Sequence, residues 1–387
     1  MVDAAKLPPD LVAEILHRLP VRDLLRCRCV NKLWLSLIDD RSFISKHLRY
    51  MSGSAGAENH SIILLRAGQN LRSIEMEPPY RVRELQPPPR RSGSKIVLVG
   101  SCNGLLCLSS LASGAAEDVA LWNPLTNDHA HLPIVPFGNF GSISMIIEGV
   151  TMIMMSSFAV IGFGYDSVTG DYKVVIIESV SKEEEQFQDI RFYSLLKNSW
   201  MRFRDDRYWL CLPQNRKMGV YVNNNLHWVM TRRSDSNATR LIVAFDLRTE
   251  DYKEVPLPFY FDNQFGVDVT VLEGCLGMVV NSHHYNVADV WIMREYGSRE
   301  SWAMLFSVPY YEVLEFDNDY YGDVCYLEPS YSGGQLLVAD MYKKYLWFDA
   351  KNQTFRTFNI SDFDSCNVGY ESFNAAVCAE SLVQVGT

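Results

Sequence analysis

Apolar residues in the first fifty positions recur at helical spacing in successive segments. The apolar residues of the first segment are Leu11, Val12, Ile15, Leu16 and Leu19. They fall on one side of an α-helix, and Pro20 ends that helix because proline lacks an amide hydrogen and clashes with the preceding turn. The same spacing returns over residues 30–38, and a third short stretch begins at Ser42. The pattern predicts a small all-α unit of about three helices over residues 1–50.

Beyond residue 93 the pattern changes to short runs of β-branched and aromatic residues separated by Asn, Asp and Gly, which is typical of an all-β domain. The runs share a form: an apolar triplet, an aromatic residue, Asn or Asp, a polar turn and a second strand. Examples are Ala120–Asp128, Gly162–Tyr172, Phe192–Trp200, Val243–Tyr252 and Leu346–Phe355. Repeats of about 40–50 residues with four strands each indicate the blades of a β-propeller.

About five blades fit between residues 96 and 360. A further blade forms if His60–Arg66 pairs with Ala376–Val385, so we predict a β-propeller-like repeat of about six blades. The repeats are degenerate, and a β-sandwich is the alternative. The small residues between Met51 and Ala57 indicate a linker, which divides the chain into residues 1–50, a linker over 51–60 and a β domain over 61–387.

Composition narrows the classes of function. The chain of 387 residues is 48% hydrophobic and 21% charged, as in a soluble globular protein, and its net charge of −10 argues against a nucleic-acid grip. Its nine cysteines contain no Cys-x-x-Cys pair, which is the usage of reduced thiols. The apolar stretch from Ile143 to Gly162 includes Glu148 and several serines, so we do not expect it to span a membrane. We expect a protein of the cytoplasm, the nucleus or both.

Candidate catalytic and metal-binding patterns are weak. His129 and His131 share a face of a strand, but the neighbouring sequence supplies no further ligand, and we expect solvated histidines at a turn edge. Asp317–Glu328 imitates the spacing of a calcium loop, but Tyr321 stands where an oxygen ligand belongs. The chain has neither a nucleophile elbow nor a P-loop. We predict no catalytic residue, metal or cofactor, and an enzyme would rest on fold analogy alone.

The N-terminal segment resembles an F-box. The resemblance rests on Leu7-Pro8, Leu19-Pro20 and the Val30-x-Lys32-x-Trp34 segment, in that order and near the start of the chain. Asn31 and Leu35 differ from the residues commoner in F-boxes. The resemblance implies binding to the Skp-type adaptor of an SCF ubiquitin ligase and, through it, to cullin and RING subunits. The residues at the positions that F-boxes use for this contact are Leu7, Pro8, Leu11, Ile15, Leu16, Leu19, Pro20, Leu24, Leu25, Val30, Lys32 and Trp34.

The β domain resembles the F-box-associated domain of a large family of plant F-box proteins. The matching stretches include Leu121–Pro124, Phe163–Asp166, Asp171–Val175, Val255–Pro258 and Val290–Gly297. The resemblance covers nearly the whole chain. It implies a substrate receptor that presents a protein for ubiquitination and degradation, without performing the chemistry itself. A scaffold that uses its F-box outside any ligase is the alternative.

Two segments stand out as candidate substrate-binding loops. Val135–Ser157 is rich in Ile and Met, and Pro309–Tyr326 is acidic and rich in Tyr. Adaptable Met side chains and rigid Tyr side chains are both enriched where proteins bind proteins, so we expect a folded protein substrate. An equal alternative is that both loops only cover the ends of the sheets. The candidate substrate-binding residues are Phe137, Phe140, Met152, Met154, Tyr310, Tyr311, Tyr320 and Tyr321.

Overall fold

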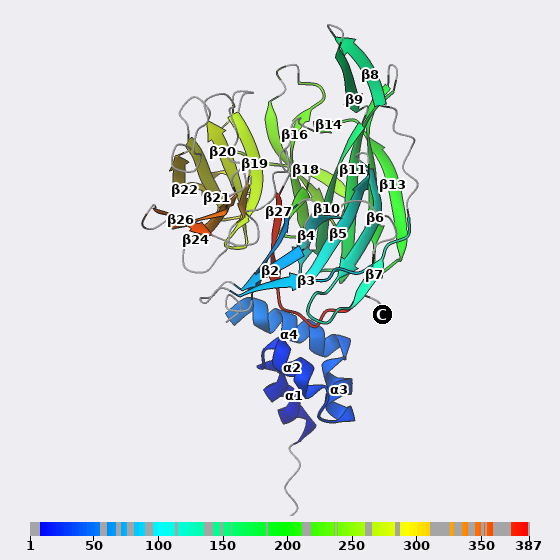
Figure 1. Cartoon of the computed structure of the whole chain (residues 1–387), viewed down its shortest axis with the longest axis vertical. Helices are drawn as coiled ribbons and strands as arrows, with labels where there is room; N and C mark the ends of the chain where they lie inside the picture. Colours follow the sequence, from blue (N-terminus) through cyan, green and yellow to red (C-terminus); the bar gives the residue numbers. More distant parts are fainter. Residues whose placement is uncertain are drawn as a thin grey trace, which may run out of the picture.

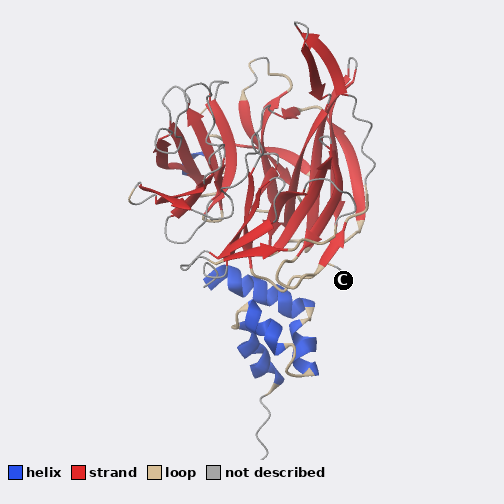
Figure 2. Cartoon of the chain, viewed as in Figure 1, coloured by secondary structure: helices blue, strands red, loops and turns tan. Residues whose placement is uncertain are grey.

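The molecule consists of an α-helical module and a much larger β domain (Figures 1 and 2). The computed structural model describes residues 8–54, 60–66, 71–75, 81–89, 96–112, 115–134, 142–147, 150–155, 157–182, 185–210, 218–235, 237, 239–259, 265–282, 287–309, 326–328, 335–339, 345–349, 352, 354–358 and 373–385. Over these ranges, no helix combines the length and the apolar character needed to cross a bilayer.

The helical module contains four described helices: α1 (Pro9–His17), α2 (Val21–Cys27), α3 (Lys32–Ile38) and α4 (Arg41–Ser54). The sequence predicted about three, and the additional one is α2. Proline fits before a helix because its fixed φ suits the first turn, and Pro8 and Pro20 immediately precede α1 and α2. Asn31 begins α3, where its side chain accepts a hydrogen bond of 2.8 Å from the Trp34 amide. The predicted linker starts too early, because residues 51–54 continue α4.

The strands form six four-stranded antiparallel units among the described residues, and we call these units blades. Blade 1 contains β27 (Phe373–Ala379), β1 (His60–Arg66), β2 (Leu71–Glu75) and β3 (Val82–Leu85). Blade 2 contains β4 (Ile96–Cys102), β5 (Leu105–Ala112), β6 (Ala115–Trp122) and β7 (His129–His131). Blade 3 contains β10 (Ser157–Asp166), β11 (Asp171–Lys182), β12 (Glu185–Ser194) and β13 (Ser199–Asp205).

Blade 4 contains β15 (Met218–Val222), β16 (Asn225–Arg232), β17 (Arg240–Asp246) and β18 (Asp251–Val255), and β14 (Tyr208–Leu210) pairs with β16. Blade 5 contains β19 (Phe265–Leu272), β20 (Cys275–Ser282), β21 (Val287–Met293) and β22 (Trp302–Pro309), with the short 3₁₀ helix η2 (Arg299–Ser301) before β22. Blade 6 contains β23 (Tyr326–Glu328), β24 (Gln335–Ala339), β25 (Tyr345–Asp349) and β26 (Thr354–Phe358). A separate hairpin consists of β8 (Ser142–Ile147) and β9 (Val150–Met155).

One strand from each blade contributes to a closed ring. Contacts run from β27 to β4, β10, β15, β19 and β23 in turn, and β23 contacts β27 again. A two-sheet sandwich has no such cycle, so the β domain is a propeller. Between blades 3 and 4, Gly162 and Gly219 lie opposite each other in parallel register, and the ring of Trp228 packs against both. A Cβ on Gly219 would lie 2.4 Å from that ring, so a larger residue cannot stand there without displacing it.

Blade 1 closes the ring with strands from distant parts of the chain. Antiparallel pairing joins β1 to β27 over seven residue pairs, from His60–Ala379 to Arg66–Phe373. The predicted closure by His60–Arg66 is therefore confirmed. The partner strand lies earlier than expected, since β27 ends at Ala379 and residues 380–385 follow as an extended segment outside the sheet.

The two ends of the propeller differ in what lies against them. The turn after β4 contains Gly104, which packs against Ser381. The turn after β6 contains Asn123, whose side-chain amide donates a hydrogen bond to the carbonyl oxygen of the same Ser381. Both turns therefore belong to the end that faces α4 (Figure 1). Connections from one blade to the next leave from the opposite end, because each fourth strand runs away from the helices. The β8–β9 hairpin lies at that far end (Figure 1).

Candidate functional site

The helical module exposes large apolar side chains. On α1, Leu11 and Ile15 are each 51% exposed, and their spacing of four residues places them side by side on the helix. Around the start of α3, Val30 is 61% exposed and Leu33 is 80% exposed. These four residues, which we call the apolar surface of the module, include three of the predicted adaptor contacts. Fully burying one such side chain is worth about 1.5–3 kcal/mol, so this surface favours a partner.

Other predicted adaptor contacts face the interior of the chain. Leu16 and Leu24 are buried in a hydrophobic cluster that also contains propeller residues. Leu19, Leu25 and Trp34 are partly buried against the same cluster. Their direct contact with an adaptor stays a prediction, and in this structure they support the fold of the module. The remaining predicted contacts are Pro8, Pro20 and Lys32, which are exposed, and Leu7, which lies outside the described residues.

Sequence reasoning did not include Leu33 and Leu35 among the candidate contacts. Leu33 belongs to the predicted apolar stripe of α3, but only Ile38 on that helix is fully buried. Leu35 is 39% exposed. The signal that could have revealed them is an excess of apolar residues, because α3 has only seven residues and one buried side cannot hold five large apolar groups.

The charge of the module differs from that of the whole chain. Residues 8–54 contain eight Lys and Arg against five Asp and Glu, a net charge of +3, whereas the whole chain carries −10. Several module charges pair locally on the surface, such as Arg18 with Glu14 at 2.8 Å and Arg26 with Asp23 at 2.9 Å. An acidic surface complements this module best, because long-range attraction between opposite charges raises the association rate.

Two buried histidines stabilise the fold in their neutral form. In the module, Nε2 of His47 lies 2.9 Å from the Leu19 carbonyl oxygen, and burial lowers the His47 pKa. In the propeller, His227 is fully buried between the Val220 carbonyl at 3.0 Å and the Tyr296 hydroxyl at 2.7 Å. Burial lowers the His227 pKa to about 4, so near neutral pH the ring donates from Nδ1 and accepts from the tyrosine at Nε2.

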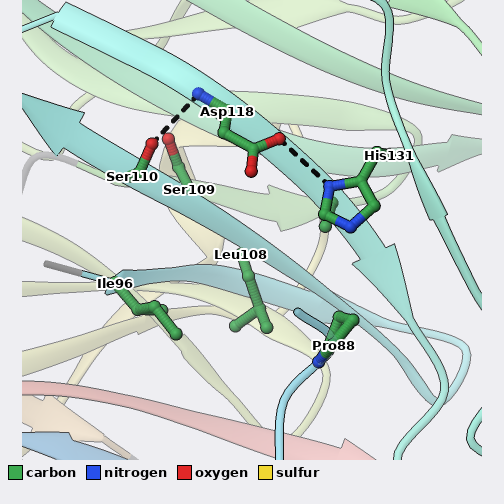
Figure 3. A pocket seen from close by; sticks show the side chains of 8 residues that line it. Pro88, Ile96, Leu108, Ser109, Ser110, Asp118 and His131 are labelled. Carbon is green, nitrogen blue, oxygen red and sulfur yellow. Dashed lines mark hydrogen bonds and ion pairs between the residues drawn. The ribbon is translucent and has the colours of Figure 1, made fainter. Parts of the chain in front are cut away.

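A small pocket lies beside blade 2 (Figure 3). Its lining includes Pro88, Ile96, Leu108, Ser109, Ser110, Asp118, Ala120 and His131. Nδ1 of His131 lies 3.1 Å from the Asp118 carboxylate, and the backbone amide of Asp118 donates to the Ser110 hydroxyl at 3.1 Å. Ser110 and His131 therefore lie on opposite sides of Asp118 (Figure 3), which is not the order of a Ser–His–Asp triad.

This pocket corrects the expectation for one histidine. His131 is half-buried and paired with a carboxylate, whereas the sequence suggested a solvated ring. The expectation failed because Asp118 reaches His131 only through the pairing of β6 with β7. His129 is exposed as expected, and its ring lies 6.0 Å from that of His131, so the two share a face. No group of three metal-binding side chains gathers in the part of the chain that the structure describes.

The candidate substrate-binding residues are for the most part not described. Phe137, Phe140, Tyr310, Tyr311, Tyr320 and Tyr321 lie outside the described residues, as does most of the calcium-like segment. Met152 and Met154 lie on β9. The segment predicted as a loop over 135–157 thus contains the β8–β9 hairpin. The second segment connects the end of β22 to the start of β23.

Comparisons with known proteins match the helical module and the β domain to separate families of domain. A family model described as an F-box domain matches residues 5–46, and one described as an F-box associated beta propeller domain matches residues 68–385. An F-box protein of Arabidopsis thaliana is 32% identical over 98% of this chain and 90% of its own length. F-box protein CPR1 from the same plant is 31% identical over 98% of this chain and 89% of its own. An F-box/kelch-repeat protein, also from Arabidopsis thaliana, is 26% identical over 80% and 81%.

Proposed function

Because the chain belongs to the plant F-box proteins with an F-box associated β-propeller domain, we propose that it is a substrate-recognition subunit of an SCF-type ubiquitin ligase. The helical module binds the Skp-type adaptor, and the propeller holds a protein substrate for ubiquitination and degradation. The observation that carries this proposal is the apolar surface of the module, formed by Leu11, Ile15, Val30 and Leu33. We place this activity in the cytoplasm, the nucleus or both.

The burial pattern of the module supports a contact with a partner. One side of α1 packs inward through Leu16, which is 1% exposed, while the other side presents Leu11 and Ile15. A helix that serves only its own fold is polar on its outer side. Several large apolar side chains left exposed on one small module are characteristic of protein-binding surfaces, where their burial drives association. The basic character of the module adds a preference for an acidic partner surface.

In this role the chain contributes proximity and no bond-making step. Holding a substrate beside a ubiquitin-charged enzyme converts a bimolecular encounter into an effectively unimolecular one, which accounts for large rate gains without a catalytic side chain in the receptor. The geometry at Ser110, Asp118 and His131 supports a structural role, because the hydroxyl and the imidazole contact different parts of Asp118.

We assign substrate binding to the end of the propeller away from α4. The helices cover the near end, where α4 contributes Phe43 and Ile44 to the cluster shared with the propeller. The far end receives the connections between blades, and such connections carry specificity in repeat folds. The first candidate segment contains the β8–β9 hairpin, which lies at that end (Figure 1), and the second connects β22 to β23. A folded protein that presents a basic patch to the acidic second segment is the substrate that this arrangement favours.

The first test addresses the adaptor. Leu11→Asp combined with Ile15→Asp places two charges in the apolar surface, and we expect the double variant to lose co-purification with a Skp-type adaptor. The matched control is Val168→Asp combined with Leu196→Asp, because those propeller side chains are similarly exposed, at 59% and 66%. Circular dichroism checks that both variants fold. Undiminished adaptor binding by the module variant would refute the proposal.

The second test addresses the ligase. The full chain is assembled with adaptor, cullin and RING subunits, and partners captured by the propeller are supplied as substrates. We expect ubiquitin transfer to a captured partner to require both the module and the far end of the propeller. A complex that assembles but never modifies any captured partner would instead support a scaffold outside the ligase pathway.

A further inference from the structure

The segment over residues 380–385 lies between the helical module and the propeller. It follows β27 directly, and four of its side chains are buried: Ser381, Leu382, Val383 and Val385. One hydrophobic cluster joins the three apolar residues of this segment to residues of α1, α2, α3 and α4 and to propeller residues. The module and the propeller therefore share a core that this segment helps to fill.

The propeller holds the 380–385 segment through its backbone. The side-chain amide of Asn123, which is fully buried, donates to the carbonyl oxygens of Ser381 at 3.0 Å and Val383 at 2.9 Å. The amide of Val385 donates to the Asp128 carboxylate at 2.6 Å. Backbone bonds of this kind fix the path of the segment whatever its side chains are.

A glycine in the first turn of blade 2 gives the segment room. Gly104 has a φ of +80°, and a Cβ there would lie 2.3 Å from the Ser381 hydroxyl and 2.7 Å from the Ala379 carbonyl oxygen. The preceding Asn103 also has a positive φ, as a two-residue hairpin turn requires. The same Asn-Gly turn thus reverses the strand and leaves space for the segment.

The helical module holds the segment through Arg22 of α2. Its guanidinium lies 2.5 Å from the carboxylate of Glu380 and 3.6 Å from that of Glu75 on β2. The same Glu75 carboxylate lies 2.9 Å from Arg83 on β3. Arg22 therefore links α2 both to the 380–385 segment and to β2 of blade 1, so rotation of the module about the propeller would break both contacts.

We propose that residues 380–385, with Arg22 as a positioning residue, hold the F-box module in one orientation on the propeller. The consequence for ubiquitin transfer rests on the function proposed above. A receptor gains more rate from proximity where its two binding surfaces keep a fixed separation, since a freely turning joint dilutes the substrate over a larger volume. The 380–385 segment therefore sets where the far end of the propeller stands relative to the adaptor.

The orientation is measured on the full chain without any partner. Spin labels are attached through genetically encoded p-acetylphenylalanine at Ser36 on α3 and at Leu196 in the exposed turn of blade 3. We expect one narrow distance distribution in the unmodified chain. Arg22→Glu and Glu380→Arg, each alone, should lose the single narrow peak, and the two together should restore it because the charges are exchanged.

Arg26→Glu is the matched control, because Arg26 lies on the same helix and its carboxylate partner, Asp23, belongs to that helix too. We expect it to leave the distribution unchanged. Deletion of residues 380–387 should broaden the distribution most. A broad distribution in the unmodified chain, or a narrow one after the deletion, would overturn the proposal. Equal effects of Arg22→Glu and Arg26→Glu, or failure of the charge exchange to restore the peak, would overturn the role of Arg22.

The consequence is read from ubiquitin transfer to the chain's own lysines in the assembled ligase. Mass spectrometry should show a restricted set of modified lysines in the unmodified chain and in the charge exchange, and a loss of that restriction in Arg22→Glu. An unchanged set in Arg22→Glu would contradict the consequence. If no complex assembles, the proposed function fails, and the distance distributions still decide the orientation.

Discussion

The helical module and the propeller differ in how completely they bury their apolar side chains. In blade 4, β16 buries six consecutive residues from Asn225 to Met230, because both faces of a blade pack against neighbouring blades. In the module, α1 buries only Leu16 and leaves Leu11 and Ile15 half exposed. A closed ring gives every blade two neighbours, whereas a short helical unit covers one side of each helix. The propeller thus closes on itself, whereas the module leaves apolar side chains exposed for the adaptor that we propose.

The largest expected effect breaks the closed core of the propeller. Phe245 is fully buried and packs on Phe192, Phe203 and Tyr252. Phe245→Ala should lower the free energy of unfolding by about 3–5 kcal/mol, because it removes apolar contacts and leaves a cavity. Denaturant unfolding followed by circular dichroism measures the change. Leu196→Ala, at a side chain that is 66% exposed, is the control and should stay within about 0.5 kcal/mol.

A change of pH tests the propeller through His227. Its pKa is about 4 in the folded chain and ordinarily 6.5, because burial disfavours the charged ring. The unfolded chain therefore binds the proton more readily, so stability is full above pH 6.5 and falls as the pH drops toward 4. We expect His227 to account for a loss of roughly 3 kcal/mol by pH 4. In His227→Gln, the free energy of unfolding should depend less on pH between 6.5 and 4. An unchanged pH dependence would contradict the assignment of this loss to His227.

A smaller effect is expected at the start of α3. The Asn31 side chain accepts from the Trp34 amide, which has no helical partner of its own. Asn31→Ala should destabilise the chain by about 1 kcal/mol, and Asn31→Ser should restore most of the loss because serine also caps helices. Hydrogen exchange of the α3 amides measures the local change. Protection in Asn31→Ala equal to that in the unmodified chain would show that this cap does not stabilise the helix.

The smallest effect on stability is expected at Leu33, an exposed apolar residue of the module, where binding and folding should respond differently to substitution. Leu33 is 80% exposed, so Leu33→Ala should change the free energy of unfolding by less than about 0.5 kcal/mol. The same substitution should weaken adaptor binding about tenfold, since truncating a central apolar contact typically costs over 1 kcal/mol. Calorimetric titration with the adaptor gives the affinity. Leu35→Ala, at 39% exposed, provides a second point on the same helix.

Sequence periodicity predicted elements that are long or repeated, and it failed where a neighbour decides the outcome. The pairing of His60–Arg66 with the distant C-terminal strand was predictable because an unpaired first blade needs a partner. α2 was missed because its seven residues contain only three large apolar groups before Cys27, at Val21, Leu24 and Leu25, which is too few to show a helical period. The end of α4 was missed because small residues after Met51 suggest a linker, yet the helix continues to Ser54.

In the candidate site, too, local pattern predicted which residues matter, but distant neighbours decided which of them are buried or paired. Sequence identified the leucines of the F-box, but only packing separates buried Leu24 from exposed Leu11. The pairing of His131 with Asp118 depends on strand register, which no local pattern reveals. The contact of Arg22 with Glu380 joins residues 358 positions apart and was equally invisible.

The pairing that closes blade 1 can form only late in the synthesis of the chain. β1 is complete at Arg66, but its partner β27 is complete only at Ala379. At about 5–20 residues per second, a ribosome needs roughly 15–60 s to make the intervening residues. Throughout that interval α1, α2 and α3 have already been synthesised, while the ring has a missing strand. The helices of the module are therefore made well before the propeller can close, but the core that the two share is complete only when residues 380–385 have been made.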